Sequence, residues 1–156
     1  MPNMSLNSTE NKDSITTGFP SLSFDEKFEI TSPKDSRYNC IAWAADRNDI
    51  WWWPYIPQLD GSHWPIPEKD FTFDNLIRVF QGIGYRVCES DAFEPKFKKV
   101  ALYVDEAGDF THASRQLRSG LWTSKLGREF DISHENPYLI EGDIYGKVGV
   151  IMSTKF

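Results

Sequence analysis

The feature that most constrains the fold is a series of short β-rich segments in the second half of this 156-residue chain. They are residues 85–88 (YRVC), 98–104 (KKVALYV), 110–117 (FTHASRQL), 121–125 (LWTSK) and 145–152 (YGKVGVIM). β-branched and aromatic residues of this kind favour strands. Residues 105–109 (DEAGD) and 118–120 (RSG) have the composition of tight turns, so the strands that they join are expected to be antiparallel neighbours.

Two helices are expected before these strands. The first is short and starts within a residue or two of Cys40, with Ser36 or Asn39 as its cap. The second follows Thr72, where Phe73, Leu76, Ile77 and Phe80 recur at helical spacing. Helices followed by a meander of strands predict an α+β domain, with N-terminal helices packed on a C-terminal antiparallel sheet.

The remaining segments are expected to be irregular. Residues 1–22 are polar and poor in periodicity, which predicts a flexible N-terminal arm, and residues 23–156 are expected to form one domain. Residues 48–67 carry four prolines among many aromatic residues and predict a long loop.

Charge and composition exclude several functional classes. The net charge is −6, with 17 basic and 23 acidic residues, which argues against a nucleic acid partner. The chain shows no long apolar run and no signal-peptide pattern, so no membrane association and a cytoplasmic location are expected. In that reducing compartment Cys40 and Cys88 are expected to be free thiols. A zinc site built from Cys40, Cys88, His63 and His112 lacks the paired-ligand spacing of such sites, so neither a metal nor a cofactor is expected.

Cys40 has two interpretations. A cysteine at a helix N-terminus has a stabilised thiolate, and the free backbone N–H groups there can bind an oxyanion. Cysteine is equally a common small residue in apolar cores.

A nucleophilic cysteine needs a base, and the histidines are His63, His112 and His134. His63 and His134 lie in or beside expected loops and are weaker candidates. Alternation along residues 110–117 places His112 on one strand face with Ser114 and Gln116, so this polar face is either solvated or lines a site.

The group that orients His112 depends on the following turn. If the loop after Leu117 has three residues, Trp122 and Ser124 share the face of His112; a two-residue loop would place Thr123 and Lys125 there instead. Ser124 is preferred for its size and its hydrogen-bonding hydroxyl.

The blocks YNCIAWA, WWWP, THASRQL and GLWTSKLG resemble an uncharacterised bacterial family, over about residues 36–150. The order of a cysteine at a helix start, a histidine on a strand and a polar residue on the next strand is distantly similar to the papain-like cysteine hydrolases, which include the NlpC/P60 and CHAP proteins. The resemblance implies a papain-like fold and a cysteine peptidase or amidase acting on a peptide or another amide. It implies Cys40 as nucleophile, His112 as general base, and Asn39 or the Cys40 backbone N–H as oxyanion donor. The position before the nucleophile, commonly aspartate in NlpC/P60 proteins, is Asn39.

The tryptophan run also has two interpretations. Trp52 and Trp53, together with Trp122, are candidates for a substrate-binding aromatic wall, with Trp43, Tyr55 and Trp64 nearby. Alternatively, the rings pack over a proline-rich loop. The competing functional hypothesis is a catalytically inactive domain that binds a protein or peptide through this aromatic loop.

Overall fold

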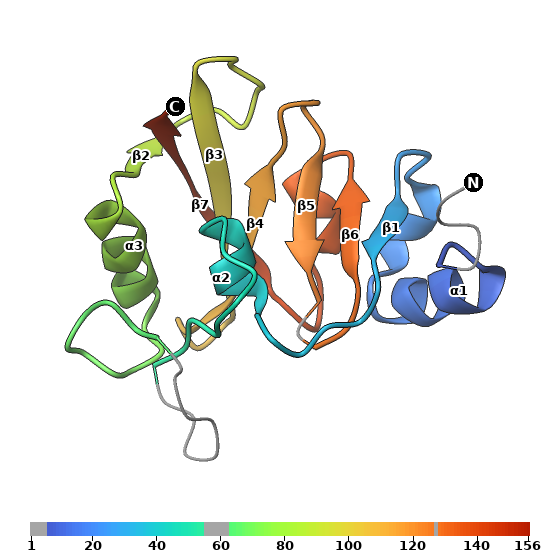
Figure 1. The fold of residues 1–156 in the computed structure, drawn as a ribbon, viewed down its shortest axis with the longest axis horizontal. Helices are drawn as coiled ribbons and strands as arrows, with labels where there is room; N and C mark the ends of the chain where they lie inside the picture. The colour runs from blue at the N-terminus through green and yellow to red at the C-terminus, as the bar shows by residue number, and fades with distance from the viewer. Residues whose placement is uncertain (1–5, 55–62, 127) are drawn as a thin grey trace.

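The centre of the molecule is a seven-stranded sheet in which every neighbouring pair of strands is antiparallel (Figure 1). The computed structural model describes residues 6–54, 63–126 and 128–156. The strands are β1 (Glu29–Ser32), β2 (Arg86–Cys88), β3 (Phe97–Val104), β4 (Phe110–Gln116), β5 (Trp122–Lys125), β6 (Asp131–His134) and β7 (Lys147–Lys155). Their order is β1-β6-β5-β4-β3-β7-β2, so the sheet is open, with β1 and β2 at its edges.

The strands expected from the sequence are all present in the structure, and two further strands were missed. β3, β4 and β5 are antiparallel neighbours, as their turns predict. The missed strands are β1 (EITS) and β6 (DISH), each four residues long and rich in polar or charged residues. All four β6 residues are buried because this strand lies between β5 and β1. Tertiary position, more than intrinsic preference, makes this segment a strand.

Helices cover the sheet on two sides. The helices are α1 (Thr9–Gly18), α2 (Cys40–Ala44) and α3 (Phe73–Gly82), with 3-10 turns η1 (Pro20–Phe24) and η2 (Pro137–Ile140). We call the sheet face packed by α2 and α3 the front face. The opposite face, packed by α1, η1 and η2, is the back face (Figure 1). Leu102 and Ala113 belong to the apolar cluster of the front face, and Tyr103 and Ile132 belong to that of the back face. The domain is therefore α+β, with a core on each side of one sheet.

Both expected helices form. Asn39 caps α2 by accepting a hydrogen bond from the Ala42 backbone N–H, 3.2 Å away. α3 begins directly after Thr72, and its Leu76 and Phe80 are fully buried against the front face. An amphipathic stripe of this kind is the pattern that the sequence shows most clearly.

The segment expected to be a flexible arm, residues 1–22, contains helix α1 and turn η1 in the part that the structure describes; residues 1–5 lie outside it. Ser8 caps α1 by accepting a hydrogen bond from the Asn11 backbone N–H. Ile15, Phe19 and Leu22 are buried in the back-face core. Three apolar residues at spacings of four and three are too few to show as periodicity in a polar segment, yet they suffice to hold a helix on the sheet.

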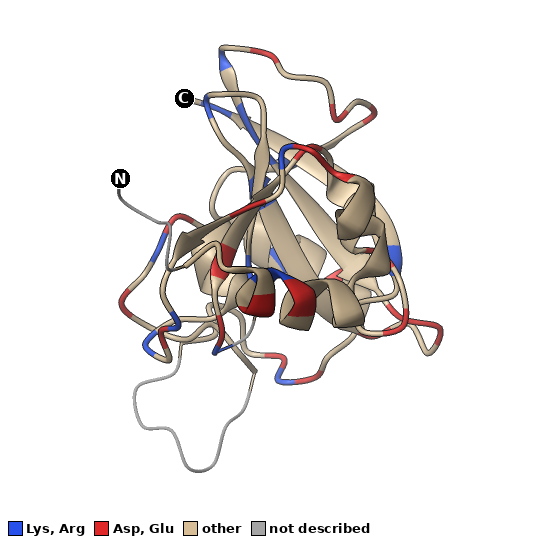
Figure 2. Cartoon of the chain, turned by 90° about the vertical axis from the view of Figure 1, so that its right-hand side faces the viewer, with Lys and Arg blue, Asp and Glu red and all other residues tan. Residues whose placement is uncertain are grey.

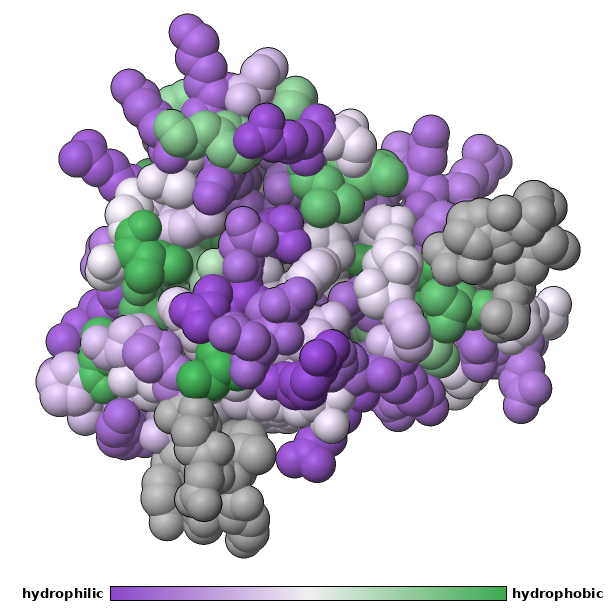
Figure 3. Space-filling model, in the orientation of Figure 1, coloured by the Kyte–Doolittle hydropathy of each residue, from purple (hydrophilic) through white to green (hydrophobic). Residues whose placement is uncertain are grey.

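Acidic and basic residues are interspersed around the molecule (Figure 2). The side seen in Figure 3 is largely hydrophilic, with separate hydrophobic areas instead of one continuous patch. Within the described ranges, no helix has both the length and the apolar character that a membrane crossing requires.

Candidate functional site

Cys40 is the first residue of α2 and lies in the front-face core, 5% exposed. Burial raises the pKa of its thiol to about 11, and nearby backbone N–H groups, chiefly that of Ala113, lower it only in part. A thiol with this pKa is protonated at neutral pH, whereas the thiolate is the nucleophilic form. Both Cys40 and Cys88 are free thiols.

His112 lies on the other side of the sheet from Cys40. Its ring stacks on Tyr145, with ring centroids 4.0 Å apart, and makes an edge contact with Tyr103 in the back-face core. Successive side chains of a strand point to opposite faces. Ala113 packs in the front-face cluster with Cys40, so its neighbour His112 faces away from the thiol. The strand β4 separates the two groups that a Cys–His hydrolase would bring together.

Asn39, the expected oxyanion donor, has a structural role instead. Its carboxamide NH₂ donates to the Trp52 carbonyl at 2.9 Å, and its oxygen accepts from the Trp52 N–H at 3.0 Å. The side chain is 1% exposed. It therefore joins the start of α2 to the tryptophan segment, and its N–H groups face a carbonyl instead of an open site.

The three proposed substrate-binding tryptophans do not share a surface. Trp52 is buried in the front-face core, whereas Trp122 is buried in the back-face core. Trp53 is partly buried and contacts the rings of Phe71 and Phe110. Trp64 is buried as well and stacks on Phe110. These residues pack the core as the second interpretation expected, while Tyr55 lies outside the described residues.

The expected partnership of His112 and Ser124 is present. The loop after Leu117 has three residues, because the Leu117 N–H donates to the Leu121 carbonyl, and β4 pairs with β5 in the register that places Ser124 on the His112 face. His112 Nε2 lies 3.1 Å from Ser124 Oγ. The same hydroxyl lies 2.9 Å from Nε2 of His134, which is fully buried instead of at the surface.

The direction of these hydrogen bonds follows from one carbonyl. His134 Nδ1 lies 2.8 Å from the Asn136 carbonyl, which only accepts, so Nδ1 carries the proton and Nε2 accepts from Ser124. The Ser124 oxygen then accepts from His112 Nε2, which leaves the buried His112 Nδ1 unprotonated and without a partner among the described residues. Both imidazoles are neutral and enclosed, and the trio works as a buried polar connection between β4, β5 and β6.

We expect iodoacetamide at pH 7.5 to leave Cys40 unmodified in the folded protein, because its thiol is buried and its pKa is raised to about 11. Cys88, which is half-buried, should be alkylated first. Peptide mass spectrometry of labelled protein measures both sites, and labelling in urea supplies the control in which both react. Rapid alkylation of native Cys40 would contradict the structural role and favour a nucleophile.

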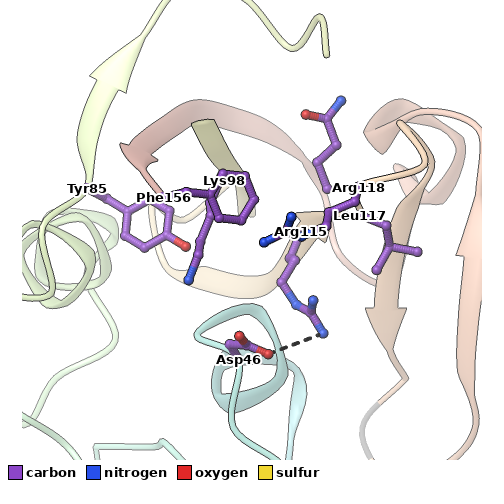
Figure 4. A pocket seen from close by; sticks show the side chains of 8 residues that line it. Asp46, Tyr85, Lys98, Arg115, Leu117, Arg118 and Phe156 are labelled. Carbon is purple, nitrogen blue, oxygen red and sulfur yellow. Dashed lines mark ion pairs between the residues drawn. The ribbon is translucent and has the colours of Figure 1, made fainter. Parts of the chain in front are cut away.

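A different group of functional side chains surrounds a cavity of about 420 Å³ at one end of the front face (Figure 4). We call it the basic pocket; its lining residues are Asp46, Tyr85, Lys98, Arg115, Gln116, Leu117, Arg118 and Phe156. Asp46 follows α2, Tyr85 precedes β2, and Lys98 and Arg115 lie on β3 and β4. Three cationic side chains and one carboxylate meet here on a chain that is acidic overall.

Arg115 is the most firmly held cation of the pocket. Its Nε donates to the Trp43 carbonyl at 3.0 Å, and its guanidinium lies over the Trp43 ring, 4.6 Å from the centroid. Its side chain is 17% exposed, and its Nη2 lies 3.9 Å from an Asp46 carboxylate oxygen, beyond hydrogen-bond distance. The guanidinium is therefore fixed in place, and apart from the long ion pair with Asp46 its Nη groups make no hydrogen bond within the described residues (Figure 4).

Lys98 and Arg118 complete the charged wall. The Arg118 guanidinium lies 4.3 Å and the Lys98 ammonium 5.6 Å from the centroid of the Phe156 ring. Within the described part of the chain, neither cation forms an ion pair. Tyr85 is buried, and its hydroxyl likewise has no hydrogen-bond partner among these residues.

Two buried lysines elsewhere in this fold have hydrogen-bond acceptors for their ammonium groups. The Lys99 ammonium contacts two backbone carbonyls and the Glu94 carboxylate at 2.7–2.8 Å. The Lys125 ammonium donates to the Glu129 carbonyl. The donors of the basic pocket differ because the protein supplies them with so few acceptors.

The sequence interpretation missed the basic pocket, although β4 carried a signal. Alternation places Arg115 on the same strand face as Ala113, the face expected to be apolar. A charged residue at such a position needs a partner or a special environment. Lys98, Tyr85 and Asp46 gave no comparable signal. The pairing of β3 with β4 brings Lys98 beside Arg115. The sheet order brings Tyr85 near, and the packing of α2 adds Asp46.

Comparison with known protein families matches residues 29–153 to a family described as Domain of unknown function (DUF7689). The chain belongs to this family. The matched range contains every basic-pocket residue except Phe156, and it also contains Cys40 and the His112 trio. No curated protein and no solved structure matches the chain, so neither the papain-like fold nor hydrolase activity gains support from a relative. Within the described ranges, no group of three or more His, Cys, Asp or Glu side chains is placed to bind a metal ion.

Proposed function

We propose that this protein is a non-catalytic binding domain whose ligand presents a negatively charged group to the basic pocket. The observation that carries the proposal is the convergence of Lys98, Arg115, Arg118 and the Tyr85 hydroxyl on one cavity. Only one carboxylate side chain lines this cavity, that of Asp46, and it lies 3.9 Å from Arg115 Nη2. Polar hydrogen-bond donors arranged around a cavity are typical of ligand sites.

The two functions suggested by the sequence have unequal support. A papain-like Cys–His hydrolase requires Cys40 and His112 within reach of each other, and the strand β4 lies between them. A binding domain makes no such demand. The aromatic loop is a weaker site than the basic pocket, because Trp52 and Trp64 are buried.

The test compares two double variants that each remove two positive charges. Lys98→Gln/Arg118→Gln removes two cations of the pocket, and Lys69→Gln/Lys147→Gln removes two exposed lysines elsewhere. Thermal unfolding is followed in inorganic phosphate, malonate and acetate, each against sodium chloride of equal ionic strength.

We expect at least one of these anions to raise the Tm of the unmodified protein and of the exposed-lysine variant, because a ligand that binds only the folded state stabilises it. The pocket variant should lose this increase. If no anion raises Tm beyond the chloride reference, or if the pocket variant retains the increase, the proposed function is wrong.

A further inference from the structure

We infer that the group recognised in the basic pocket is a phosphate, either free or at the end of a small molecule, in preference to a carboxylate. This inference rests on the proposed function and specifies its ligand. It follows from the origins of the hydrogen-bond donors, the charges and the volume of the pocket.

The donors reach the cavity from several elements of the fold. Tyr85, Lys98 and Arg115 come from three separate strands or strand ends, and Arg118 comes from the turn between β4 and β5 (Figure 4). A carboxylate offers two oxygens in one plane and a single charge. A phosphate monoester offers three terminal oxygens in a tetrahedral arrangement and a charge of about −1.5 to −2 at neutral pH. The tetrahedral anion can accept hydrogen bonds from several sides at once.

Arg115 supplies the directional contact. The Arg115 side chain donates a hydrogen bond to the Trp43 carbonyl and lies over the Trp43 ring. These two contacts fix the plane of the guanidinium in the absence of a ligand. A preorganised guanidinium binds phosphate with two parallel N–H donors, which lysine cannot do. The Tyr85 hydroxyl adds a neutral donor; burial raises its pKa to about 12, so it stays protonated at neutral pH.

Asp46 is the one carboxylate side chain that lines the pocket, and it opposes the binding of any anion. It has a positive φ of 68°, a conformation that asparagine also adopts readily. Asp46→Asn therefore removes the negative charge without disturbing the backbone. We expect this variant to bind phosphate several-fold more tightly than the unmodified protein.

The volume of about 420 Å³ lies near the lower end of the range for small-molecule sites. A phosphate group together with a few further atoms fits such a space. The phosphate can come from free inorganic phosphate or from a phosphorylated small molecule, and the two sources share the same recognition chemistry.

Isothermal titration at pH 7.5 and low ionic strength uses inorganic phosphate, O-phosphoserine and malonate, the last being a dianion that carries only carboxylates. We expect at least one phosphate probe to bind with a Kd at least tenfold lower than malonate, and the tighter of the two identifies the source. Arg115→Lys should lower phosphate affinity at least tenfold, and Tyr85→Phe, which removes only a hydroxyl, should lower it several-fold. Circular dichroism checks that each variant is folded.

The outcomes separate the two proposals. If malonate binds as tightly as both phosphate probes, charge alone decides and the phosphate inference is overturned, while the anion-binding function stands. If Arg115→Lys and Tyr85→Phe both leave phosphate affinity unchanged, the assignment of these donors is overturned. If none of the three anions binds, the proposed function fails together with the inference.

Discussion

Acidification from pH 6.5 to pH 4 is expected to destabilise the folded protein, by about 3 kcal/mol through His134 alone. Burial lowers the pKa of His134 from 6.5 to about 4, although the Asn136 carbonyl acts in the opposite direction. Burial also lowers the pKa of His112 well below 6.5, with a further contribution from His134.

The sign follows from where protons bind. In this pH range the unfolded chain takes up a proton at each of these imidazoles, whereas the folded protein takes up fewer, because the pKa of each imidazole is lowered. Stability therefore falls as the pH falls. Protonation would also place two N–H donors on Ser124 and leave its own hydroxyl hydrogen without an acceptor, since Ser124 joins both Nε2 atoms.

Urea unfolding at half-unit pH steps measures this dependence. Buried Asp131, whose pKa is raised by burial, acts in the opposite direction near the acidic end of the range, so the histidine contribution is best isolated by a variant. His134→Asn preserves a donor toward the Asn136 carbonyl and should show a smaller loss of stability between pH 6.5 and 4. His63→Gln removes an exposed imidazole and serves as the control. An unchanged pH dependence in His134→Asn would show that the folded protein does not hold this imidazole neutral.

Trp52→Ala is expected to cost about 3–5 kcal/mol of unfolding free energy, the range for removing a large buried aromatic side chain. Trp52 is 5% exposed and belongs to the same front-face cluster as Cys40 and Ile41. Its ring also contacts that of His63, and its backbone N–H and carbonyl form hydrogen bonds with the Asn39 side chain. The substitution opens a cavity beside α2.

Trp51→Ala is the matched control in the neighbouring position. Trp51 is only partly buried; its Nε1 donates to the Ser36 carbonyl, and the Arg128 guanidinium lies over its ring at 5.2 Å. Loss of these contacts should cost about 1 kcal/mol. Urea midpoints with unchanged m-values measure both effects. Equal costs at the two positions would contradict the assignment of Trp52 to the core and Trp51 to its margin.

The local elements were largely readable from the sequence. The spacing of Leu76 and Phe80 predicts α3, Asn39 is one of the two caps predicted for α2, and a three-residue turn is one of the two alternatives that the sequence offers after Leu117. Each of these signals lies within one helix, one cap or one hairpin. The strand β6 escaped notice because DISH becomes a strand only between two neighbours that bury it.

The basic pocket could not be predicted from the sequence in the same way. By itself the sequence predicted the antiparallel hairpins and the two helix starts, because near neighbours in the chain decide these features. It left two turn lengths open after Leu117, and the structure selects the three-residue turn that places Ser124 beside His112. Only the tertiary structure decided that Cys40 and His112 face opposite sides of the sheet, since that depends on which face α2 packs against. The same packing sets Asp46 beside Arg115, and the pairing of β3 with β4 adds Lys98 to the basic pocket. The physical reason is that the spacing of residues along a strand fixes the relative directions of neighbouring side chains. Which face of the sheet a given side chain occupies depends instead on how the whole core is buried.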